Sequence, residues 1–133
     1  MEKEFVPYEQ ALALKELGFN EKCFFVYNFK NKLVQKSPTI PLEHCINIDG
    51  GHGAQCTAPL YQQTFRWFRE NHFLHSHITC SCTMNEILSY DWTIHKIMNP
   101  GTREENFITD YERTYEEAEL ECLMKLIEIV KNK

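Results

Sequence analysis

The C-terminal segment holds the feature that most limits how this chain can fold, a helix start signal followed by a long amphipathic run. Thr114 and Glu117 have the spacing of a capping box, in which each side chain bonds the backbone N–H of the other residue. From there to Val130, apolar residues recur at helical spacing, which predicts a long terminal helix. The apolar band of its second half is wide, so we expect burial on two sides or contact with another copy, and burial within the chain is favoured. The band consists of Leu123, Met124, Leu126, Ile127, Ile129 and Val130.

Two earlier segments also have helical patterns. Residues 8–17 are rich in strong helix formers, and Pro7 and Gly18 suit the start and end of a helix there. A second helix is predicted from Thr57 as its cap, with Pro59 in its first turn. The apolar side of this second helix is formed by Leu60, Tyr61, Thr64, Phe65 and Phe68.

The remaining ordered segments have strand patterns. Residues 23–27 and 33–35 are predicted to form a hairpin, because aromatic and β-branched residues flank a polar turn. Residues 75–82 and 90–98 alternate in polarity, which predicts an antiparallel pair joined by a polar loop. Residues 36–56 contain prolines and a glycine cluster, so we expect an irregular loop with a short strand near Ile46.

The order of these elements predicts an α+β fold. Three amphipathic helices would cover one face of a small antiparallel sheet and form a two-layer structure. At 133 residues the chain has the usual size of one domain, so residues 1–133 are predicted to form a single domain.

Composition and the search for targeting signals indicate in which compartment the protein acts and which kinds of partner it binds. The N-terminus is acidic, and no segment resembles a signal peptide or a membrane span, so we expect a cytoplasmic protein with no membrane association. The six cysteines are then expected to stay reduced, most of them as small core residues. The formal net charge of −5 disfavours sequence-independent binding to nucleic acids.

A group of histidines and cysteines near the middle of the chain raises the question of a metal site. In an extended strand His75 and His77 lie on one face and Cys80 and Cys82 on the other, with the core. A site built from His75, His77 and His95, with Asp91 as a ligand or supporting group, is geometrically conceivable. Histidine is also common on a solvated sheet face, so we assign no metal and no cofactor.

Two neighbouring pairs of residues are candidates for cysteine catalysis. Cys56 with His52, or Cys45 with His44, would bring a thiol near a base. No known signature of a catalytic cysteine surrounds Cys56, and adjacent residues diverge in a strand. We therefore assign no catalytic residue.

Three segments carry a resemblance to a known family. YEQALALKELGF, APLYQQTFRWFRE and TYEEAELECLMKLIEIVK resemble a family of small proteins carried by phages, mobile elements and genomes of gut Bacteroidales bacteria. The likeness covers about the first 27 residues together with residues 58–70 and 114–131. The family has no assigned activity, so the resemblance implies the setting of a mobile-element accessory protein and no mechanism.

An uncovered sheet face that mixes aromatic and histidine side chains is the predicted binding site. Such a face can stack on and hydrogen-bond a ligand, or a second subunit can cover it in a homodimer. The predicted binding residues are Phe25, Tyr27, His75, His77, Asp91, Thr93 and His95. We expect a non-enzymatic protein that engages a host protein or captures a small-molecule ligand. The alternatives are a small metal-dependent or cysteine-dependent enzyme and a structural component of a phage particle.

Overall fold

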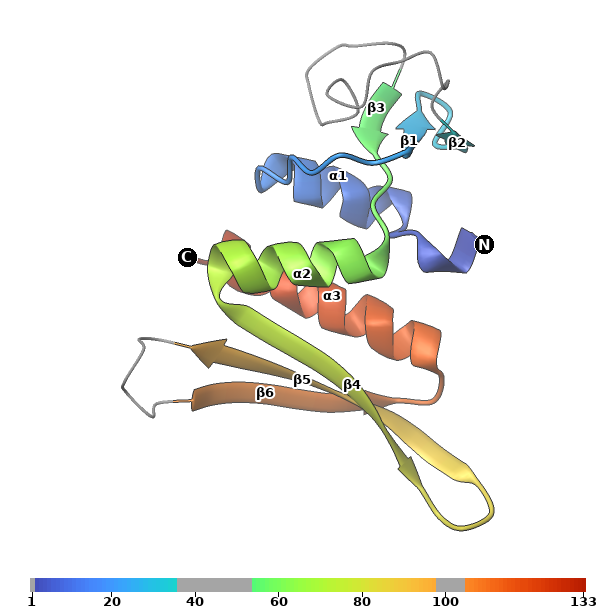
Figure 1. Ribbon diagram of the computed structural model, residues 1–133, viewed down its shortest axis with the longest axis vertical. Helices are drawn as coiled ribbons and strands as arrows, with labels where there is room; N and C mark the ends of the chain where they lie inside the picture. The colour runs from blue at the N-terminus through green and yellow to red at the C-terminus, as the bar shows by residue number, and fades with distance from the viewer. Residues whose placement is uncertain (1, 36–53, 98–104) are drawn as a thin grey trace. The chain divides into compact units, whose positions relative to one another are not determined.

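The computed structural model describes residues 2–35, 54–97 and 105–133 (Figure 1). The chain divides into two compact units, Met1–Tyr61 and Gln62–Lys133, and the described residues of each are treated separately. The helices are α1 (Tyr8–Glu16), α2 (Tyr61–His72) and α3 (Tyr115–Lys131), preceded by a short 3-10 helix at Glu2–Glu4. The strands are β1 (Phe25–Asn28), β2 (Leu33–Gln35), β3 (Ala54–Thr57), β4 (Leu74–Cys82), β5 (Ile87–Ile97) and β6 (Glu105–Glu112).

The chain has an α+β fold, as predicted, but the arrangement of its strands differs from the prediction. The described strands form two antiparallel sheets of three strands each, in the orders β2-β1-β3 and β4-β5-β6, where a single sheet was expected. A common face for all three helices in two layers is not confirmed, because the strands are divided between two sheets. The single domain over residues 1–133 stays a prediction.

In the first unit, α1 and the hairpin form as predicted. Ala11 and Leu14 are buried on one side of α1, and Gly18 follows the helix with φ of +90°, a conformation that glycine adopts without strain. β1 pairs with β2, and the Asn28 side chain closes the turn between them. Its Oδ1 accepts hydrogen bonds from the backbone N–H groups of Lys30 and Lys32 at 2.9 and 3.0 Å.

Strand β3 was not expected, and it corrects the predicted start of the second helix. Cys56 and Thr57 pair with Tyr27 and Val26 of β1, so Thr57 is a strand residue, and α2 begins only at Tyr61. Both residues are buried, and strand pairing with β1 prevails over the local capping pattern. The short strand predicted near Ile46 lies outside the described residues.

The second unit contains the predicted pair of long strands together with an additional one. β4 and β5 pair over nearly their full length, which confirms the predicted antiparallel pair. β6 then pairs with β5, which places β5 at the centre and leaves β4 and β6 at the two edges.

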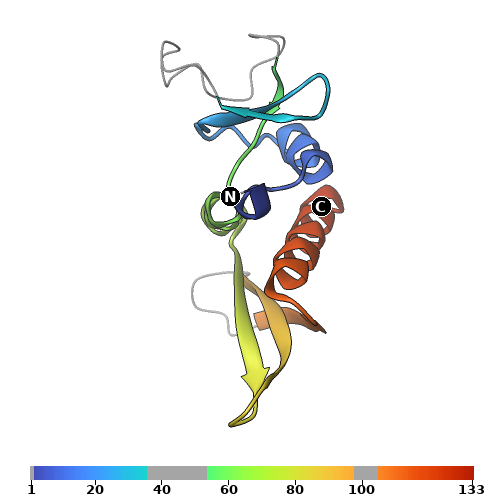
Figure 2. The ribbon, with the colours of Figure 1, turned by 90° about the vertical axis from the view of Figure 1, so that its right-hand side faces the viewer.

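Helix α3 covers one face of this second sheet. Its capping box is confirmed, since Thr114 Oγ1 accepts from the Glu117 backbone N–H and Glu117 Oε2 accepts from that of Thr114, both at 3.2 Å. Figure 2 shows the helix running along one side of the strands. The buried side of the helix is formed by Ala118, Cys122, Leu123, Leu126 and Ile127. Met124, on the other side, is 43% exposed, so the apolar band is buried over part of its width.

Candidate functional site

The strand register of the second sheet places the predicted polar residues on one face. His75 lies opposite His95, and His77 lies opposite Thr93. Asp91 lies opposite Thr79, one pair further along. Directly opposed residues of an antiparallel pair point to the same side. The predicted meeting of the polar faces of these two strands is therefore confirmed.

This polar side is the one turned away from α3. Trp92 and Ile94, which alternate with the polar residues of β5, are 5% and 1% exposed. The Tyr90 ring on the same side as Trp92 meets the ring of Tyr115 in α3, with centroids 5.8 Å apart. We call the opposite side the histidine face. It comprises His75, His77, Thr79 and Ser81 of β4, Ser89, Asp91, Thr93 and His95 of β5, and Thr109 and Tyr111 of β6.

Ring stacking and hydroxyl hydrogen bonds join the three strands across this face. The His77 and His95 rings are stacked, with centroids 5.1 Å apart and planes 18° from parallel. The Thr93 hydroxyl donates to Thr109 Oγ1 at 3.2 Å, and the Thr109 hydroxyl donates to the Trp92 carbonyl oxygen at 3.1 Å. These contacts link side chains of β4, β5 and β6 across the face.

Asp91 is the acidic residue of the histidine face, and two neighbouring serine hydroxyls donate hydrogen bonds to its carboxylate. Ser81 donates to Oδ2 at 2.5 Å, and Ser89 donates to Oδ1 at 2.9 Å. Both carboxylate oxygens therefore have a partner within the sheet. Across residues 2–35, 54–97 and 105–133, no three His, Cys, Asp or Glu side chains gather so that they could hold a metal ion. The arrangement of His75, His77, His95 and Asp91 weighed as a metal site is thus not assembled.

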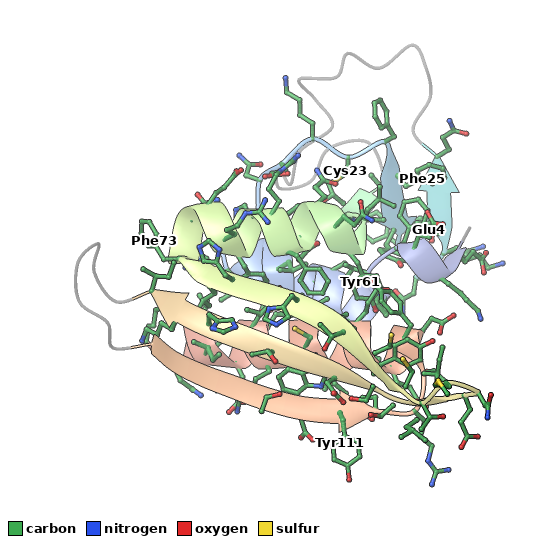
Figure 3. The ribbon with its side chains drawn as sticks, turned by 60° about the horizontal axis from the view of Figure 1, so that its bottom comes forward. Glu4, Cys23, Phe25, Tyr61, Phe73 and Tyr111 are labelled. Atoms are coloured by element: carbon green, nitrogen blue, oxygen red, sulfur yellow. The ribbon has the colours of Figure 1, made fainter. Side chains whose placement is uncertain are left out.

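Two residues of the histidine face were missed because β6 was not predicted. Tyr111 is 69% exposed and projects from β6, as Figure 3 shows. Its backbone N–H donates to Asp110 Oδ1 at 2.9 Å. Thr109 lies on the same side, two residues earlier. The run of aromatic and β-branched residues from Phe107 to Thr109, followed by Tyr111, is the signal that could have indicated this strand.

Phe25 and Tyr27, the two aromatic members of the predicted site, lie on the other sheet. β1 pairs with β2 and β3, so these residues share no sheet face with the histidines. Tyr27 is only 8% exposed, and its hydroxyl donates to the Val6 carbonyl oxygen at 2.7 Å. Burial raises the pKa of Tyr27, and the charges of Cys56 and Glu2 raise it further. The single face predicted for all seven residues is therefore wrong.

The cysteines fall into buried and exposed groups. Cys23, Cys56 and Cys122 are buried, as expected for core residues, and all described cysteines are free thiols. Cys80 and Cys82 are exposed, so their predicted place in the core is wrong. They lie in the last three residues of β4. Cys80 is paired with Tyr90, whose ring meets that of Tyr115, the first residue of α3, so these cysteines lie near the end of the sheet where the helix begins.

The buried thiols are poor nucleophiles. Burial raises the pKa of Cys56 to about 11, although the nearby Lys15 lowers it in part. Burial also raises the pKa of Cys122 to about 12, although a hydrogen bond with the Ser76 side chain lowers this pKa in part. A thiol with such a pKa is protonated at neutral pH and therefore unreactive. His52, His44 and Cys45 lie outside the described residues.

The loop between β4 and β5 was predicted to be polar, and its tip is in part apolar. Met84 is fully exposed, and Ile87 and Leu88 at the start of β5 are more than half exposed. Thr83 holds the turn, because its Oγ1 accepts from the backbone N–H groups of Asn85 and Glu86.

No helix in the described part of the chain is long and apolar enough to cross a membrane. Comparisons of the chain with known protein families, with curated proteins and with solved structures found no match.

Proposed function

We propose that this chain is a non-enzymatic binding protein that holds another protein on the histidine face. The observation that carries the proposal is the stacked pair of His77 and His95 beside the exposed Tyr111, on a sheet side that α3 leaves uncovered. Side chains of this kind combine an apolar body with a polar end, and aromatic residues are enriched where proteins meet.

The form of the face favours a protein partner over a small molecule. Binding sites for small molecules are concave and enclose most of the ligand. The histidine face is the side of a three-stranded sheet, and its polar groups are spread over all three strands. A second protein can contact such an extended surface with several side chains at once.

The contacts within the face also favour binding. The side chains of His77, His95, Thr93 and Asp91 already have partners in the sheet, so little conformational freedom is lost when a partner binds. The formal charge of −5 favours a partner with a basic or neutral surface. The resemblance to proteins of phages and mobile elements makes a protein of the bacterial host the partner we propose.

An enzymatic role has less support. The buried thiols of Cys56 and Cys122 have raised pKa values, which oppose thiolate chemistry. Asp91 is already hydrogen-bonded through both of its carboxylate oxygens. A metal-dependent or cysteine-dependent enzyme and a phage structural component therefore remain alternatives without a specific contact in their favour.

The test compares affinity enrichment from expressing cells with the wild type, a Tyr111→Ala/His95→Ala variant and a Lys125→Ala variant. Lys125 lies on the exposed side of α3, where its Nζ pairs with Glu128 at 2.8 Å, so it serves as a matched surface control. Proteins retained by the wild type and the control, and lost from the double variant, would then be purified and titrated against the chain by calorimetry.

We expect a direct complex that the double variant weakens by at least about tenfold, since loss of an aromatic hot-spot residue costs about 2 kcal/mol or more and a tenfold change corresponds to about 1.4 kcal/mol. Circular dichroism and thermal unfolding would verify that both variants are folded. A partner that binds the double variant as tightly as the wild type would exclude the histidine face as the binding surface. A small molecule found by native mass spectrometry in place of a protein would also overturn the proposal.

A further inference from the structure

Strand β4 forms an edge of the second sheet, with β5 as its sole strand neighbour in the described part of the chain. An edge strand presents unpaired backbone N–H and C=O groups, which can pair with a strand of another chain. Natural proteins usually block such an edge with charged residues, proline, or a very short strand. β4 has none of these features, because its nine residues, LHSHITCSC, include no Asp, Glu, Lys, Arg or Pro.

The opposite edge of the same sheet is protected by charge. β6 has the sequence ENFITDYE and carries Asp110 and Glu112 in its second half. Partial burial raises the pKa of Glu112, and the nearby carboxylates of Glu121, Asp110 and Glu117 raise it further. A second copy approaching β6 would bring the same carboxylates against them. The two edges therefore differ in their capacity for self-association.

We propose that β4 pairs antiparallel with β4 of a second copy, about a two-fold axis through Ile78. This pairing joins two three-stranded sheets into one continuous sheet across the dimer. Two-fold symmetry uses the same surface on both copies, so a strand that matches its own reverse is suited to it.

The β4 sequence is complementary to its own reverse about Ile78. On the histidine face, His75 of one copy comes opposite Ser81 of the other, and His77 comes opposite Thr79. Each imidazole thus meets a hydroxyl, and the two groups can hydrogen-bond as donor and acceptor.

The other side of β4 is also compatible with this register. Ile78 comes opposite Ile78 of the second copy, and Ser76 comes opposite Cys80. Because β4 contains no Asp, Glu, Lys or Arg, the pairing brings no like charges of these residues together along the strand, although each chain has a formal charge of −5. This absence of opposed charges favours a second copy as the occupant of the edge.

This dimer is distinct from the complex proposed above. It uses the edge of β4, whereas the proposed protein partner contacts the face of the sheet. The dimer would place the histidine faces of both copies side by side on one surface. A monomeric protein could still bind a partner on its own face, so the two proposals fail independently.

The test uses two double variants that share Thr79→Lys and differ only at His77. In the proposed register residue 77 of each copy faces residue 79 of the other. Two-fold symmetry gives two such contacts in the dimer. In His77→Lys/Thr79→Lys each contact would place two ammonium groups opposite each other, whereas in His77→Glu/Thr79→Lys each would pair a carboxylate with an ammonium group. Within one copy both variants place the lysine opposite Asp91, so their sheets are perturbed alike at that position. Light scattering coupled to size exclusion and native mass spectrometry give the mass.

We expect the wild type and His77→Glu/Thr79→Lys to have the mass of two chains, and His77→Lys/Thr79→Lys that of one chain. Thr109→Lys, on β6, should leave the dimer unchanged. Circular dichroism would verify that each variant is folded. A wild type that is monomeric up to millimolar concentration would overturn the proposal. A dimer that both double variants keep, or that both lose, would overturn the pairing about Ile78.

Discussion

The imidazole rings of His77 and His95 stack across β4 and β5, with centroids 5.1 Å apart and planes 18° from parallel. The two residues are not directly opposite, because His77 pairs with Thr93 and His95 with His75. Their contact is therefore a diagonal one, which long or aromatic side chains can make across a sheet. This stack fixes the position of two of the predicted binding residues relative to each other.

A double-mutant cycle should detect this stack. His77→Ala and His95→Ala are each expected to lower the free energy of unfolding, and the double variant to lose less than the sum of the two. The coupling should be about 0.2–1 kcal/mol, the range for cross-strand pairs. Urea unfolding followed by circular dichroism measures it. Thr79→Ala combined with His95→Ala is the control and should be additive, so equal coupling in both cycles would refute a specific stack.

Loss of the Tyr27 hydroxyl should destabilise the first unit. In Tyr27→Phe the Val6 carbonyl oxygen loses a buried donor at 2.7 Å, and the ring contact with Tyr8 stays possible. We expect a decrease of about 1–2 kcal/mol in the free energy of unfolding. Tyr111→Phe, at a residue that is 69% exposed, is the matched control and should change stability by less than about 0.5 kcal/mol. Equal effects of the two substitutions would contradict this account.

The capping box of α3 should contribute measurably to the second unit. Thr114→Ala removes the acceptor of the Glu117 backbone N–H, and we expect a loss of about 1 kcal/mol. Thr114→Ser keeps a hydroxyl at the same position and should retain most of the stability. Thermal unfolding of the three proteins tests this expectation. If Thr114→Ser were as unstable as Thr114→Ala, the hydroxyl would not be the stabilising group.

Local sequence patterns were sufficient to predict most helices and strands. The capping box of Thr114 and Glu117 and the helical spacing after it describe α3 closely. The alternation in β4 and β5 also assigned their polar residues to one side, because side-chain direction in a strand depends only on whether the residue number is odd or even. For this reason His75, His77, Asp91, Thr93 and His95 were correctly placed together.

Pairing between distant segments could not be predicted in the same way. β3 and β6 are strands because β1 and β5 pair with them. In β6 the charged residues also obscure the alternation between polar and apolar side chains that indicates a strand. The assignment of Phe25 and Tyr27 to the histidine face required knowing which sheet β1 joins, and that depends on β3. Similarly, Cys80 is exposed although it shares a side of β4 with Ile78, and its partner Tyr90 meets the first residue of α3, a relationship that no pattern within β4 contains.

The environment of His72 favours the neutral imidazole. The His72 ring packs against the rings of Trp67 and Phe68, with centroids 4.7 and 5.8 Å away. Its Nε2 is buried and has no hydrogen-bond partner among the residues that the structure describes. A proton on this nitrogen would thus lack an acceptor. Burial, and to a lesser degree the charge of Lys133, lowers the pKa of His72 from its ordinary value of 6.5.

Because the pKa of His72 is lower in the folded chain than in the unfolded chain, the unfolded state binds the proton more readily. The stabilising contribution of neutral His72 is therefore complete above pH 6.5 and decreases as the pH falls from 6.5 toward the folded pKa. We expect the wild type to lose more stability than His72→Gln between neutral pH and about pH 5 in urea unfolding. If His72→Gln lost as much stability on acidification as the wild type, proton uptake by His72 on unfolding would be excluded.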